Sequence, residues 1–97
     1  MKLELHPEAL ARFHEIQTDL RSTSAKRAHA FAAEMRRIGS MLRQFPRAGT
    51  PVGSLRRVAM HRFQYSILYE IDGEVVRMTT IEPQKREPDY WADSGNS

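Results

Sequence analysis

The sequence predicts an α+β domain in the order β-α-α-β-β-β, with two antiparallel helices packed on one face of a small antiparallel sheet. Apolar side chains recur at spacings of three and four through residues 10–45, as they do on amphipathic helices. Apolar and polar side chains alternate through residues 55–82, as they do on half-buried strands. Because two helices can cover only one face of such a sheet, we expect the other face to meet water or a partner.

The first half of the chain predicts a short strand over residues 2–5 and two helices. Pro7 and Glu8 suit the start of the first helix, because Pro is favoured at the first helical position and Glu at the positive end of the helix dipole. The apolar stripe of this helix is Leu10, Phe13, Ile16 and Leu20. A break at residues 22–24 precedes a longer helix, which Pro46 ends. Its stripe is Ala28, Phe31, Ala32, Met35, Ile38, Leu42 and Phe45.

The second half predicts a loop over residues 47–54 and then strands over residues 55–60, 65–71 and 75–82. Asp72-Gly73 is a two-residue hairpin signal of type I′, and such a turn pairs Ile71 with Glu74 and Ile67 with Met78. The face covered by the helices then carries Tyr65, Ile67, Tyr69, Ile71, Val76 and Met78. The open face carries Ser66, Leu68, Glu70, Val75, Arg77, Thr79 and Ile81.

Length and composition indicate one domain over residues 1–91 and a flexible polar tail over residues 92–97. The chain has no Cys, which excludes a disulfide framework and a thiol nucleophile. It has no apolar run long enough to span a bilayer and no signal-peptide pattern, so we expect a cytoplasmic protein.

Most of the 15 basic residues are Arg, which binds phosphates and carboxylates through paired donors. Nucleic acid and acidic protein segments are therefore the expected partner classes.

Four local strings, in this order and at these spacings, resemble the RelE/ParE superfamily of bacterial toxins, and in particular its ParE-like, plasmid-stabilisation branch. They are His6-Pro7-Glu8-Ala9, Phe45-Pro46-Arg47-Ala48-Gly49, Leu55-Arg56-Arg57 with Arg62-Phe63-Gln64-Tyr65-Ser66-Ile67-Leu68-Tyr69, and Arg86-Glu87-Pro88-Asp89-Tyr90-Trp91. The resemblance implies the toxin of a type II toxin–antitoxin module, neutralised by a cognate antitoxin whose C-terminal amphipathic segment folds on the toxin in a hetero-oligomer. ParE-like members inhibit DNA gyrase, whereas RelE-like members cut mRNA on the ribosome. We expect gyrase inhibition without catalysis, with mRNA cleavage as the alternative and an inert family member as a third possibility.

If the chain is a nuclease, the resemblance implies a set of charge-stabilising residues on and after the last three strands. The candidates are Arg56, Arg62, Arg77, Lys85, Arg86 and Tyr90. The pattern gives no clear pair of proton-transfer residues, since Arg is a poor general base and Pro83 stands where many members carry His. His61, in the turn before the strand over residues 65–71, is the remaining candidate. Arg56 and Arg57 are neighbours on one strand, so only one of them can lie on the open face.

The surface expected to bind the antitoxin combines apolar and basic residues of the open face with residues after the last strand. These are Arg56, Leu68, Val75, Arg77, Ile81, Arg86 and Trp91. No cofactor or metal is expected, because His6, His14 and His29 lack metal-ligand spacing. Arg36, Arg37 and Arg43 are interpreted as a solvated helix face.

Overall fold

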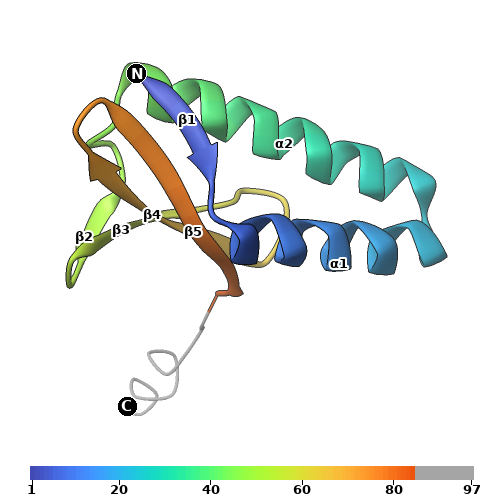
Figure 1. Ribbon diagram of the computed structural model, residues 1–97. Helices are drawn as coiled ribbons and strands as arrows, with labels where there is room; N and C mark the ends of the chain where they lie inside the picture. Colours follow the sequence, from blue (N-terminus) through green and yellow to red (C-terminus); the bar gives the residue numbers. More distant parts are fainter. Residues whose placement is uncertain (85–97) are drawn as a thin grey trace, which may run out of the picture.

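The computed structural model describes residues 1–84 and contains two helices and a five-stranded sheet (Figure 1). The elements in chain order are β1 (Lys2–Leu5), α1 (Pro7–Thr23), α2 (Ala25–Gln44), β2 (Thr50–Val52), β3 (Leu55–Ala59), β4 (Tyr65–Asp72) and β5 (Val75–Pro83). The strands are ordered β1-β5-β4-β3-β2 across the sheet, and the two helices lie antiparallel on one face of it. The predicted α+β fold with its helix pair is confirmed. The predicted end of the domain at residue 91 and the predicted tail lie outside the described residues.

The sheet is mixed, whereas a purely antiparallel sheet was expected. Strand β1 runs parallel to β5, with Leu3 opposite Val76 and Leu5 opposite Met78. The two helices follow β1 directly in the chain, so β1 cannot form a hairpin with the next strand. It pairs instead with β5, which is distant in the sequence. A second difference is β2, which forms within the segment predicted to be a loop and pairs antiparallel with β3.

Side-chain caps fix the start of α1 and the start of α2. His6 accepts a hydrogen bond from the amide of Glu8 through Nδ1, at 3.1 Å, and Pro7 occupies the first helical turn as predicted. The hydroxyl of Ser24 accepts from the amide of Arg27 at 3.1 Å and so caps the start of α2. Phe45 lies past the end of α2 and is 62% exposed, so its predicted place on the apolar stripe is wrong.

The core lies between α2, α1 and the helix-facing side of the sheet. Phe31, Ile38 and Leu42 of α2 are fully buried against side chains of the sheet. The largest buried side chains of the sheet are Ile67, Tyr69, Val76, Met78 and Ile81. The first four were predicted for this face, whereas Ile81 was predicted for the opposite one.

The position of Ile81 is explained by a β-bulge in β5. Tyr69 pairs with Met78, but Leu68 pairs with Thr80, so Thr79 is an extra residue without a partner on β4. Since one extra residue reverses the side-chain alternation, Ile81 turns into the core beside Ile67. The predicted pair of Ile67 and Met78 is wrong, because both the register of the hairpin and the bulge differ from the prediction.

The hairpin between β4 and β5 also differs from the prediction by its turn. Gly73 has a φ of +63°, and no non-Gly residue of the turn has a positive φ, so the turn is not of type I′. Positive φ at the first central position alone is the pattern of a type II′ turn. Gly73 and Glu74 are then the central residues, and Asp72 pairs with Val75 in place of the predicted pair Ile71 and Glu74.

The hydroxyl of Tyr69 connects the sheet to the segment that follows α2. It donates to the carbonyl of Pro46 at 2.7 Å and accepts from the amide of Gly49 at 2.8 Å, while the side chain is 0% exposed. A Cβ atom at Gly49 would lie 2.7 Å from this hydroxyl and 2.9 Å from the carbonyl of Arg57, so no larger residue fits there. Arg56 adds a hydrogen bond from Nη1 to the carbonyl of Gly49 at 2.8 Å.

We expect Tyr69→Phe to lower the free energy of unfolding by about 1–3 kcal/mol, because it leaves the amide of Gly49 and the carbonyl of Pro46 without a partner. Chemical denaturation followed by circular dichroism measures the change. Tyr65→Phe is the matched control, since the hydroxyl of Tyr65 makes no hydrogen bond within residues 1–84. Equal stability of the two variants would contradict this role of Tyr69.

Candidate functional site

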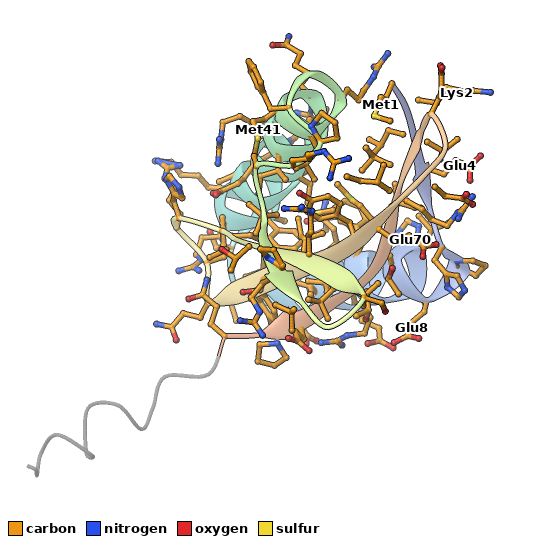
Figure 2. All side chains as sticks on the ribbon, turned by 90° about the vertical axis from the view of Figure 1, so that its left-hand side faces the viewer. Met1, Lys2, Glu4, Glu8, Met41 and Glu70 are labelled. Atoms are coloured by element: carbon orange, nitrogen blue, oxygen red, sulfur yellow. The ribbon has the colours of Figure 1, made fainter. Side chains whose placement is uncertain are left out.

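The side of the sheet that faces away from the helices is the candidate functional site. Figure 2 views the molecule from the left-hand side of Figure 1, with the strands in front and the helices behind them. Within residues 1–84 no helix packs on this side, which we call the open face. Direct pairing places two rows of side chains across its strands: Arg57, Leu68 and Thr80 in one row, and Ala59, Ser66 and Glu82 in the other.

Arg77 lies on the open face as predicted, but three carboxylates surround its guanidinium group. Nη1 contacts Glu70 at 2.8 Å and Asp72 at 3.1 Å, and Nε contacts Glu4 at 3.2 Å. Glu4 and Glu70 come from β1 and β4, on either side of β5, and Figure 2 labels both. The hydrogen bonds that Arg77 donates to Glu70, Asp72 and Glu4 raise the pKa of Arg77 above its ordinary value. The positive charge of Arg77 is therefore neutralised within this part of the face.

Arg57, and not Arg56, is the arginine of β3 that points to the open face. Arg57 is exposed and pairs directly with Leu68, whereas Arg56 pairs with the buried Tyr69. Arg56 is directed to the carbonyls of Arg47 and Gly49, so its role is structural. The sequence indicates this arrangement, because Arg56, Val58 and the buried Met60 are two residues apart and therefore lie on the same face of the strand.

A cavity of about 240 Å³ lies on the open face beside the end of β5, lined by Arg57, Ala59, Ser66, Glu82, Pro83 and Gln84. Ala59 and Ser66 are small, which leaves space between the guanidinium group of Arg57 on β3 and the carboxylate of Glu82 on β5. Ser66 is only 3% exposed. Glu82 reaches this face because of the bulge at Thr79, which the alternation of the sequence does not reveal.

Leu68 and Val75 are half-buried on the open face, the position predicted for them, and their role in binding a partner stays a prediction. Ile81 is 1% exposed in the core, so its predicted position on the partner-binding face is wrong. Lys85, Arg86, Tyr90 and Trp91 lie outside the described residues, and their predicted roles stay predictions.

Arg62 does not join the open face. It lies in the turn after β3 and, with His61, lines a second cavity of about 480 Å³ against α2. The nuclease candidates Arg56, Arg62 and Arg77 are therefore brought to three different places: the segment after α2, the α2 side of the turn, and the carboxylate cluster.

Glu34 of α2 holds this turn and was not singled out from the sequence. Glu34 is 7% exposed. Its carboxylate accepts a hydrogen bond from the amide of His61 at 2.6 Å and forms an ion pair with Arg37 at 3.2 Å. Burial acts to raise the pKa of Glu34, but the amides of His61 and Arg62 and the side chain of Arg37 outweigh it and hold the pKa below its ordinary value. A buried acid on an otherwise apolar helix stripe is the signal that points to such an anchor.

The described residues contain neither a membrane-spanning helix nor a cluster of metal ligands. Neither α1 nor α2 is both long enough and apolar enough to cross a membrane. In residues 1–84 no three His, Asp or Glu side chains converge in a way that would hold a metal ion.

Comparisons with known proteins agree with this architecture. The family model described as the ParE toxin of type II toxin-antitoxin system, parDE, matches residues 3–88. The chromosomal ParDE toxin–antitoxin system from P. aeruginosa contains a chain that superimposes with a TM-score of 0.75 at 17% identity, over 88% of this chain and 97% of that chain. The isolated E. coli RelE toxin gives a TM-score of 0.57 at 14% identity, over 98% of this chain and 96% of that chain.

A chain of the intact E. coli RelBE toxin–antitoxin complex gives a TM-score of 0.57 at 15% identity, over 88% of this chain and 98% of that chain. At these identities the structural likenesses establish the shared fold. No curated protein sequence matches the chain.

We expect Glu34→Gln to lower stability at neutral pH, and the difference from the wild type to shrink as the pH falls. Because the pKa of Glu34 is depressed in the folded state, the folded state binds fewer protons than the unfolded state in this range. The stabilisation is thus present above the ordinary Glu pKa of about 4.3 and is lost as the pH falls through the lower folded value. Denaturation midpoints between neutral and strongly acidic pH test this, with Glu15→Gln on exposed α1 surface as the control. A difference that does not depend on pH would contradict it.

Proposed function

Since the chain belongs to the ParE toxin family of type II toxin–antitoxin systems, we propose that it binds and inhibits DNA gyrase and that a cognate antitoxin neutralises it. The family match covers residues 3–88 and is the observation that carries this proposal. Both roles place the protein in the cytoplasm. The fold alone does not select the target, because related folds support different functions.

The distribution of arginines supports inhibition by binding over inhibition by catalysis. Cleavage of RNA without a metal needs positive charge gathered around one phosphate and a group that moves protons. Arg56, Arg62 and Arg77 are separated from one another, and Arg77 is neutralised by Glu4, Glu70 and Asp72. A toxin that acts by occupying a protein surface does not need such a cluster.

A ribosome-dependent mRNA endonuclease is the second candidate function, and the open-face cavity favours it. Arg57 and Glu82 line that cavity together, as a phosphate-binding group and a carboxylate general base would. The resemblance of the fold to E. coli RelE is consistent with either candidate. Primer extension on a translated message distinguishes the two, since only the nuclease produces cuts in phase with codons.

The open face has the composition expected of an antitoxin-binding surface. Leu68 and Val75 are half-buried apolar side chains, and Arg57 beside Leu68 is exposed and forms no ion pair within residues 1–84. An amphipathic segment would cover the two apolar side chains and place a carboxylate on Arg57. The E. coli RelBE structure, a toxin–antitoxin complex, supports a partner of this kind. Arg86 and Trp91, beyond the described residues, remain proposed contributors.

We expect the purified protein to block negative supercoiling by DNA gyrase at micromolar concentration, because the proposed mechanism needs only binding. A gel assay with relaxed plasmid measures the effect, and addition of the cognate antitoxin should restore activity. Growth after induced expression serves as the second readout. Absence of both supercoiling inhibition and growth arrest would identify an inert family member and contradict the proposal.

We expect Leu68→Glu and Arg57→Glu each to weaken the complex with the antitoxin by about tenfold or more, because each puts a charge against the apolar or acidic part of the segment. Isothermal titration calorimetry measures the affinity. Lys26→Glu, which makes the same change of charge as Arg57→Glu but on the exposed surface of α2, is the control. Arg77→Glu is less suitable, since it would gather four carboxylates and disturb the sheet itself. Unchanged affinity of both test variants would exclude the open face as the binding surface.

A further inference from the structure

The charges of the molecule are divided between two parts of the chain. Residues 24–65, which include α2, β2 and β3, contain nine Lys and Arg and one acidic residue, Glu34, for a net charge of +8. The other described residues, 1–23 and 66–84, contain four Lys and Arg and eight acidic residues, for a net charge of −4. A net charge of +3 for the whole chain therefore hides a strongly basic half.

Within the basic half, α2 and the turn after β3 form a hollow between arginines. The cavity of about 480 Å³ is lined by Ala30, Ala33, Glu34 and Arg37 of α2 and by His61 and Arg62 of the turn. Arg27 lies one helical turn before Ala30, and its guanidinium carbon is 5.1 Å from the centre of the ring of Phe63. Arg27 and the residues that line the cavity constitute the α2–turn surface: Arg27, Ala30, Ala33, Glu34, Arg37, His61 and Arg62.

The α2–turn surface is ordered by contacts within the protein. The carboxylate of Glu34 accepts from the amide of His61 at 2.6 Å and so holds the turn against α2. Phe63 anchors the turn from the other side, because it is buried and packs edge-on against Phe31. Arg27 and Arg37 are ten residues apart on one helix, hence separated by about 15 Å along its axis. The arginines are thus held far enough apart to contact different charges of one extended ligand.

From this surface we propose that the chain itself binds the phosphate backbone of duplex DNA, independently of any antitoxin. Arginine is suited to phosphate because its planar group donates two parallel hydrogen bonds. A single-stranded nucleic acid is a poorer fit, since its binding sites offer exposed aromatic rings for base stacking, and Phe31 and Phe63 at this surface are buried. Binding through phosphates alone carries no sequence preference. This activity goes beyond gyrase inhibition and would concentrate the toxin on DNA.

Fluorescence anisotropy with a short labelled duplex of arbitrary sequence tests the proposal on the full chain. We expect a dissociation constant on the order of 10⁻⁴–10⁻⁶ M that weakens with salt, with a log–log slope of about −0.9 for each phosphate neutralised. Arg62→Ala should reduce the slope by about 0.9 and Arg27→Ala with Arg62→Ala by about 1.8. The side chain of Arg62 is exposed, and Arg62 contacts Glu34 through its backbone amide, which the variant retains. Arg62→Ala is therefore expected to fold normally.

Lys2→Ala, which removes one positive charge from the acidic half of the chain, is the matched control and should change the slope little. Absence of salt-dependent binding, or an equal loss in the control, would overturn the proposal. Tighter binding of single-stranded RNA, or binding of polyglutamate without binding of DNA, would also overturn it and assign the surface to another ligand. Because the measurement uses neither gyrase nor antitoxin, its failure is distinguishable from failure of the proposed function.

Discussion

The two hydrogen bonds of the Tyr69 hydroxyl are the interaction on which the arrangement of the sheet depends. Tyr69 is fully buried under the helices, so its hydroxyl must find partners inside the protein. It finds them in the carbonyl of Pro46 and the amide of Gly49, in the segment that carries the chain from α2 to β2. The close approach leaves no room for a side chain at position 49. The start of β2, and with it the pairing of β3, is thereby tied to the centre of β4.

This constraint determines which arginine of β3 is available on the surface. With Arg56 opposite Tyr69, its guanidinium group turns to the carbonyls beside Gly49 and is used in the fold. Arg57 is left on the open face beside Leu68. The bulge at Thr79 completes the same region, because it buries Ile81 and turns Glu82 outward to the cavity that Arg57 also lines. The hydrogen bonds of the Tyr69 hydroxyl and the bulge at Thr79, neither of which involves a charged side chain, therefore determine which charged groups reach this face.

The two basic regions of the chain differ in how far their charge is already neutralised. On the open face, Arg77 is balanced by carboxylates from three places in the sequence, which makes that end of the sheet a structural cluster. On the α2–turn surface, Glu34 pairs with Arg37 and the backbone of the turn, and Arg62 forms no ion pair within residues 1–84. Residues 24–65 contain nine basic residues and one acidic residue, so this part of the chain has excess positive charge. Surfaces for a protein partner and for a polyanion can thus coexist on one small domain.

The sequence by itself determined the number and order of the helices, the three long strands and most of the core, because hydrophobic periodicity and residues such as Pro7, Ser24 and Pro46 act locally. It also indicated a sheet with one uncovered face carrying Leu68, Val75 and Arg77. Only the tertiary structure decided the parallel pairing of β1, the hairpin register, the choice between Arg56 and Arg57, and the burial of Ile81. Each of these depends on contacts between residues far apart in the chain or on one unpaired residue, Thr79, that alternation does not mark.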